Sequence, residues 1–227
     1  MTIAACIRCS DGIILCADTE ETVTDDLKGN ASKIHIVMHQ TSRKKYFQLT
    51  TKIGDSRRDG GLWHGRGDWI IGMAGAGHAD WISTFIQDMR EPVLLEMFGR
   101  KIDFDKLRNF LTQYAQDFFS KYIKTYAENP SYRPQAQMLV VGQSKNQHEV
   151  FRINDNVVLH GEWTEAVAVG KGAPTFQYLA KRLLPSYEYS MKQAASIAVL
   201  HHEEGEIRGC WVRRKFSHCA DRPQGND

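Results

Sequence analysis

The sequence has little net charge and lacks any long hydrophobic run. Its 29 basic and 27 acidic side chains give a formal net charge of +2, too small to indicate binding to nucleic acid. No stretch approaches the roughly 18 apolar residues that a membrane-spanning helix requires. The first residues also lack the basic region of a signal peptide, and Arg8 and Asp11 interrupt their apolar runs. We therefore expect a cytoplasmic protein without a membrane or nucleic-acid partner.

Cysteine is too sparse and too irregular to indicate a disulfide framework or a zinc site. The five thiols form an odd set, and Cys6 and Cys9 have no matching second pair at metal-site spacing. Three of the five lie in apolar runs near the N-terminus, so we interpret them as small buried hydrophobic residues. His78, His201 and His202 are the other metal candidates, but adjacent helix residues point in different directions. We predict neither a metal nor an organic cofactor.

Length and composition suit one domain that spans residues 1–227. The 227 residues are 42% hydrophobic and 25% charged, as in ordinary globular proteins, and they contain no low-complexity tract or solenoid repeat. Residues 39–68 differ from their surroundings because they are rich in basic residues and glycine. We interpret them as an insertion, either a solvated loop or a contact surface for a neighbouring subunit, partner or substrate chain. The polar tail at 217–227 is expected to fray.

Apolar patterning predicts strands first, then helices, then strands and helices again. Apolar runs at 3–9 and 13–17 flank Asp11-Gly12, a dipeptide that favours a tight hairpin turn with positive φ at both central residues. Further strands are predicted at 32–38, 69–74, 137–142, 149–153, 157–160, 166–170 and 206–216. Helices are predicted from 79 to Pro92, and at 103–127, 173–184 and 190–202. The pattern alone supports an α+β protein with antiparallel sheets covered by helices.

The residues after Met1 suggest a nucleophile. Removal of Met1 would leave Thr2 first, with a hydroxyl and a free α-amine that can act as nucleophile and base. The reference pKa of an α-amine, about 7.7–8.0, suits this role. An acidic residue, Asp18, ends the second apolar run, and a lysine, Lys33, opens the next one. Two plainer interpretations exist: Met1 is retained and Thr2 is an ordinary strand residue, or Asp18 and Lys33 form a structural ion pair.

Several motifs resemble the proteasome-type N-terminal nucleophile hydrolases, which include catalytic proteasome β-subunits and the HslV peptidase. Residues 2–3 and the sequence DGIILCAD at 11–18 carry the first part, and KGNASKI at 28–34 is closer to the HslV version. The sequence IIGMAGAGHAD at 70–80 resembles the family's glycine loop and first helix. VAVGKG at 167–172 resembles the segment before its third helix. The likeness rests on the order and spacing of these motifs over most of the chain.

This resemblance implies a fold and a reaction. The fold is a four-layer αββα sandwich, with two antiparallel sheets flanked by helices. The reaction is that of a threonine endopeptidase, in which Thr2, Asp18 and Lys33 act together. The backbone N–H of Gly75 is the expected donor to the oxyanion.

The resemblance also implies a substrate pocket and an assembly. Ala31, His35 and Met73 lie near the positions that line the family's pocket for the residue before the cut. The expected partners are further copies of the chain in stacked rings, peptide or unfolded protein as substrate, and, where the resemblance extends so far, an ATP-dependent unfoldase.

Two positions depart from the family's pattern. Lys171 replaces a serine that supports the threonine amine, and the lysine charge would depress the pKa of that amine. Glu204 can stand in for a later aspartate, but Ile207 occupies a serine position. Lys171 and Glu204 are therefore candidate modulators of activity. A non-catalytic ring subunit and a small-molecule N-terminal nucleophile amidohydrolase remain alternatives to the peptidase.

Overall fold

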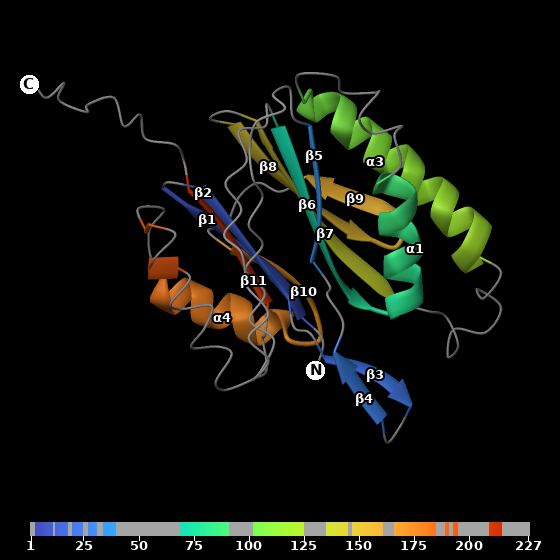
Figure 1. Ribbon diagram of the computed structural model, residues 1–227, viewed down its shortest axis with the longest axis horizontal. Coiled ribbons are helices and arrows are strands. Elements are labelled where there is room, and N and C mark those ends of the chain that lie inside the picture. The colour runs from blue at the N-terminus through green and yellow to red at the C-terminus, as the bar shows by residue number, and fades with distance from the viewer. Residues whose placement is uncertain are drawn as a thin grey trace, which may run out of the picture.

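A computed structural model gives the structure of the chain, and Figure 1 shows its helices and strands. The structure describes residues 3–10, 12–17, 20–24, 27–30, 34–39, 69–90, 102–124, 135–144, 147–160, 166–184, 189–190, 193–194 and 209–214. At 20–24, 27–30, 35–39, 90 and 209–214 the description is limited to the backbone. These residues form two larger antiparallel sheets, a two-stranded hairpin and three α-helices. The predicted α+β class with antiparallel sheets is confirmed.

Four strands form the first sheet, in the spatial order β10-β1-β2-β11. They are β1 (Ile3–Cys9), β2 (Gly12–Ala17), β10 (Ala166–Gly170) and β11 (Gly209–Arg214). All of β2 and all of β1 except Arg8 are buried, which explains their continuous apolar runs. Cys6, Cys9 and Cys16 are buried, as the sequence predicts.

The predicted hairpin of β1 and β2 is confirmed, but its turn is centred elsewhere. Cys9 pairs with Gly12, so only Ser10 and Asp11 separate the two paired residues in the chain, and Asp11 lies outside the described residues. Gly12 has no positive φ and also pairs with Arg214 of β11. The prediction of Asp11-Gly12 as the turn centre is therefore wrong, because Gly12 is a ladder residue between two neighbouring strands.

Five strands form the second sheet, in the order β5-β6-β7-β8-β9. They are β5 (Ile34–His39), β6 (Trp69–Gly77), β7 (Ala136–Ser144), β8 (Gln147–Asn154) and β9 (Val157–His160). All five were predicted, within a few residues at their ends. His39 was assigned to the insertion, but it is the last residue of β5 and pairs with Trp69.

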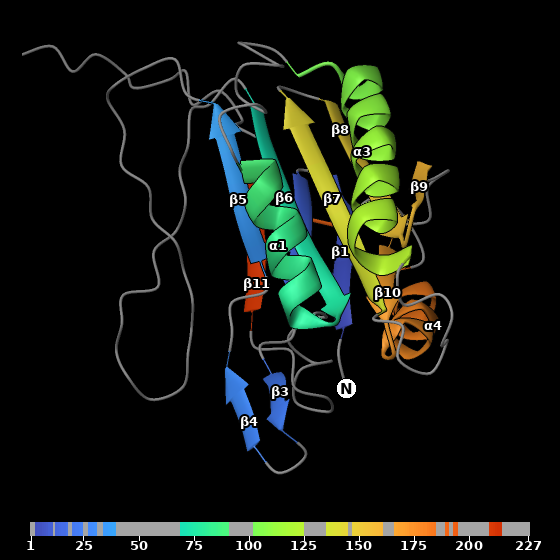
Figure 2. The same ribbon diagram turned by 90° about the vertical axis from the view of Figure 1, so that its right-hand side faces the viewer.

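A separate hairpin of β3 (Glu20–Thr24) and β4 (Leu27–Asn30) was not predicted. Its strands are short and polar, so they carry no run of alternating apolar residues that would reveal them. In both views this hairpin projects from one end of the larger sheets (Figures 1 and 2).

Helices cover the outer faces of both larger sheets (Figure 1). Helix α1 (Ala79–Arg90) and helix α3 (Phe104–Phe118), which continues as a π-helical turn at Phe119–Ile123, pack on the five-stranded sheet. Helix α4 (Ala173–Leu183) packs on the four-stranded sheet. The predicted end of the second helix at 127 and most of the predicted helix at 190–202 lie outside the described residues.

Three apolar clusters correspond to these contacts. The first lies between α1, α3 and the five-stranded sheet, and it contains Trp69, Phe85, Leu107 and Phe151. The second lies between α4 and the four-stranded sheet, with Ile3, Ile14 and Phe176. The third lies between the two sheets, with Ala4, Leu15, Ala74 and Leu139. The inner faces of the two sheets therefore pack directly on each other.

The sequence pattern predicts Phe176, Leu179, Leu183 and Leu184 on one apolar face of α4, but the buried stripe differs from this prediction. Phe176 and Leu184 are buried as expected, but Ala180 is buried between them and Leu183 is 46% exposed. The stripe thus follows the spacing i, i+4, i+8 instead of i, i+3, i+7. Small Ala180 lets the helix approach the sheet, where its cluster includes Ala5 and Ala168.

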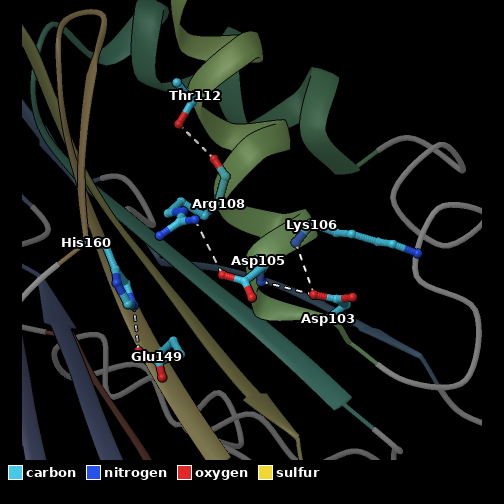
Figure 3. Close-up of polar contacts among 7 residues, drawn as sticks. All are labelled: Asp103, Asp105, Lys106, Arg108, Thr112, Glu149 and His160. Carbon is cyan, nitrogen blue, oxygen red and sulfur yellow. Dashed lines mark hydrogen bonds and ion pairs between the residues drawn. The ribbon is translucent and has the colours of Figure 1, made fainter.

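Local hydrogen bonds define the start of α3 and the β8–β9 edge (Figure 3). Asp103 caps α3, because its Oδ1 accepts from the backbone N–H of Asp105 at 3.0 Å and of Lys106 at 3.1 Å. At the sheet edge, His160 Nε2 lies 2.8 Å from Glu149 Oε2. No helix within the described parts of the chain is long and apolar enough to cross a bilayer.

The proposed insertion can be tested by replacement of residues 40–68, which lie outside the described residues. His39 and Trp69 are cross-strand partners, so the chain leaves and re-enters the sheet at adjacent positions. A two- to four-residue Gly-containing turn can join such partners. We expect the shortened chain to unfold cooperatively with a Tm within about 5 °C of the parent, because a charged, glycine-rich segment contributes little apolar burial. Loss of soluble, cooperatively unfolding protein would contradict the insertion hypothesis.

Candidate active site

One end of the two packed sheets brings together strand termini that are distant in sequence. β1 and β5 begin there, while β6 and β10 end there (Figure 2). β2 ends at the same place, because its last residue, Ala17, pairs with Ala4 of β1. Three Cα pairings define this end: Ile3 with Gly170, Ala4 with Ala17, and Ile34 with Ala74. We call it the site end, because the candidate catalytic residues predicted from the sequence are adjacent in the chain to these strand termini.

Small side chains fill the space between the sheets at the site end. Ala4 and Ala17 of the first sheet share a buried cluster with Ala74 and Ala76 of the second, and each is at most 1% exposed. Alanine methyl groups allow the two backbones to approach closely. The start of β1 is therefore held near the end of β6.

The central predicted residues lie outside the described residues. This applies to Thr2, Asp18, Lys33, Ala31 and Glu204. The chain nevertheless fixes their neighbours: Thr2 precedes Ile3, Asp18 follows Ala17, and Lys33 precedes Ile34. Each of these three neighbours is a strand residue at the site end.

Gly75 is buried in β6, one residue after the partner of Ile34. A Cβ on Gly75 would lie 2.6 Å from Cγ2 of Ile82 in α1. Glycine is therefore required here by the close packing of α1 on β6, a reason that sequence analysis did not identify. The proposed role of its backbone N–H as an oxyanion donor stays a prediction.

The pocket candidates His35 and Met73 are cross-strand partners in β5 and β6. Met73 is 1% exposed and belongs to the apolar cluster under α1 and α3. As placed, it is a core residue, so a pocket lined by Met73 would have to open between β6 and α1. Only the backbone of His35 is described.

Lys171 is exposed and follows directly on Gly170, the Cα partner of Ile3. Gly170 has φ +93°, a conformation that side-chain-bearing residues rarely adopt. Its N–H donates to Oε1 of Gln137 at 2.8 Å, and Nε2 of Gln137 donates to Oδ1 of Asn154 at 3.2 Å. Sequence analysis missed this contact, because no local pattern relates residues 137 and 170.

Other chemistries receive less support from the described residues. Burial, with a smaller contribution from Cys9, raises the pKa of the Cys6 thiol far above its usual value, so it stays protonated and is a poor nucleophile. Within the described ranges, no group of three or more His, Cys, Asp or Glu residues is placed to hold a metal ion. His78 is exposed at the start of α1, with its ring centroid 6.3 Å from that of Trp81.

Solved structures share this fold at low sequence identity. Anbu from Yersinia bercovieri, described as an ancestral β-subunit, gives a TM-score of 0.61 and 14% identity over 87% of this chain and 72% of its own. Anbu from Pseudomonas aeruginosa, described as a helical assembly, gives a TM-score of 0.56 and 12% identity, and the match covers 87% of this chain and 72% of that protein. HslV from Trypanosoma brucei gives a TM-score of 0.50 and 16% identity, and the match covers 91% of this chain and 94% of that protein. No family model and no curated protein matches the chain.

At these identities the likeness shows the fold alone. The chain therefore shares the fold of the Anbu and HslV structures. The likeness to both Anbu and HslV supports the general resemblance and does not select one member.

Proposed function

We propose that the chain is a threonine-type peptidase subunit of a proteasome-like, self-compartmentalised complex in the cytoplasm. Its fold would be the four-layer αββα sandwich of N-terminal nucleophile hydrolases, with Thr2 exposed by removal of Met1. One observation carries the proposal: the strand termini adjacent in the chain to Thr2, Asp18 and Lys33 meet at the site end.

The observed registers make this convergence specific. If the β1–β2 pairing continues by one residue, Asp18 lies opposite Ile3, the residue after Thr2. If the β5–β6 pairing continues similarly, Lys33 lies opposite Gly75. Adjacent strands lie about 4.8 Å apart and stacked sheets about 10 Å apart, so this continuation would bring the backbones beside Thr2, Asp18 and Lys33 to the same end of the two sheets.

The proposed reaction uses the two functional groups of Thr2. Its Oγ attacks the peptide carbonyl carbon while the neutral α-amine accepts the hydroxyl proton. Lys33 polarises the hydroxyl, Asp18 orients Lys33, and the N–H of Gly75 donates to the oxyanion. Collapse of the tetrahedral intermediate breaks the C–N bond, and the departing amine takes the proton. Water then hydrolyses the ester, which restores the hydroxyl.

Nearby residues would tune binding and basicity. Ala31, His35 and Met73 are the proposed pocket residues, and His35 and Met73 already pair across two strands. Continuation of the β1–β10 register would put Lys171 opposite Thr2. A positive charge there lowers the pKa of the amine and favours its neutral, basic form. Glu204 would offset this effect if it pairs with Lys171.

Self-association is part of the proposal. Head-to-tail contacts between identical subunits close into rings or extend into helices. The Pseudomonas Anbu is described as a helical assembly. For the present chain we propose stacked rings. Its substrates would be peptides or unfolded proteins, and an unfoldase would be a further partner. A stable monomer in multi-angle light scattering would favour a small-molecule amidohydrolase instead.

The direct test combines intact mass with an N-terminal electrophile. Protein that begins at Thr2 is expected to form a stable adduct with a peptide epoxyketone, because that reagent bonds to both a hydroxyl and a free amine. Tandem mass spectrometry should place the adduct on Thr2. The control reagent is a serine-hydrolase inhibitor that bonds to a hydroxyl alone. Protein shown to begin at Thr2 but inert to substrates and epoxyketone would favour the non-catalytic subunit.

A further inference from the structure

The side chain of Gln137 joins the two sheets at the site end. Gln137 lies at the start of β7, and its Oε1 accepts from the N–H of Gly170 in β10 at 2.8 Å. Its Nε2 donates to Oδ1 of Asn154, the last residue of β8, at 3.2 Å. A backbone N–H can only donate, so Oε1 must face Gly170 and Nε2 must face Asn154. The amide orientation is therefore fixed by chemistry.

Both ends of this bridge lie beside the proposed catalytic groups. Gly170 is the Cα partner of Ile3, which follows Thr2 in the chain. Gln137 is the Cα partner of Ala76, which follows Gly75 in β6. The bridge thus links β10, the neighbour of the strand that would carry the nucleophile, to β7, the neighbour of the strand that would carry the oxyanion donor.

The hydrogen bond from Gly170 to Gln137 restricts the backbone conformation of Gly170. With φ at +93°, Gly170 turns the chain out of β10 toward Lys171. A glycine has a wide range of accessible backbone conformations, so a contact is needed to select one. The hydrogen bond to Gln137 selects the conformation in which Gly170 still pairs with Ile3.

We propose that Gln137 is a positioning residue that holds the start of β1 at a fixed distance from β6. This inference rests on the proposed function and adds to it a residue that the family resemblance did not supply. Asn154 is its partner, because it fixes the amide of Gln137 in the orientation that accepts from Gly170. A displacement of about 1 Å between reacting groups lowers catalytic rates by about 10²-fold.

Gln137→Met tests the bridge, since methionine is similar in length and cannot accept the bond from Gly170. We expect kcat for a fluorogenic peptide to fall about 10- to 100-fold, with KM within about twofold and a Tm change of a few degrees. Gln137→Glu should restore most of kcat, because a carboxylate accepts from Gly170 and Asn154 can turn its amide to donate. Gln143→Met is the matched control, on the same strand about 20 Å away, and should leave kcat unchanged.

A second readout is independent of activity. Hydrogen–deuterium exchange of peptides covering 167–172 should be faster in Gln137→Met and near the parent rate in Gln137→Glu. Unchanged exchange in Gln137→Met would overturn the bridge itself. Faster exchange with unchanged kcat would overturn the positioning role alone. A parent protein that begins at Thr2 and is inert would overturn the proposed function, and the positioning role with it, whatever the exchange shows.

Discussion

Thr2→Ala is expected to abolish peptide hydrolysis and epoxyketone labelling while leaving the fold intact. The substitution removes the only hydroxyl that the proposed mechanism uses as nucleophile, so kcat should fall by about 10³-fold or more. Ile3, the next residue, is 1% exposed and keeps β1 in the core, so the Tm should change little. Activity is measured with a fluorogenic peptide, labelling by intact mass, and stability by thermal unfolding.

Two further variants sharpen this experiment. Thr2→Ser keeps the hydroxyl and the α-amine, so it should retain activity and labelling. Lys33→Ala should abolish hydrolysis, because the hydroxyl loses its polarising partner. Hydrolysis that persists in Thr2→Ala would exclude Thr2 as the nucleophile, and intact mass must show for each variant that Met1 has been removed.

Gly77→Ala is expected to produce the largest loss of stability among single substitutions at the site end, about 4 kcal/mol or more. Gly77 has φ +123°, which L-residues rarely adopt. A Cβ there would collide with the carbonyl oxygen of Gln135 and lie 2.9 Å from its carbonyl carbon. That oxygen accepts from the N–H of His78 at 2.8 Å, so it cannot move away without loss of the bond that holds the residue before α1 to Gln135.

Gly72→Ala on the same strand is the matched control. Its Cβ would lie 3.2 Å from Cδ2 of Leu15, a side-chain atom that can shift, and its φ is not positive. We expect a cost of about 1 kcal/mol at this position. Denaturant unfolding measures both variants, and similar losses in the two would contradict the steric argument for Gly77.

Local patterning was sufficient to predict most of the fold. The apolar runs of β1 and β2, the five strands of the second sheet and the three helices follow from periodicity in contiguous segments. The polar hairpin β3–β4 was missed, because its short strands have no alternating apolar residues in their sequence. The buried face of α4 was misassigned by one ridge, since the choice of Ala180 over Leu183 depends on the sheet beneath it.

The sequence by itself determined which residues are candidates for chemistry, because the order of motifs carried the resemblance from Thr2 to Gly75. It could not show that the strand ends beside them meet, since that depends on pairing registers and on the packing of two sheets. It also predicted neither the role of Ile82 in excluding a side chain at Gly75 nor the bridge from Gln137 to Gly170. These contacts join residues far apart in the chain, and only the tertiary structure brings such residues within bonding distance.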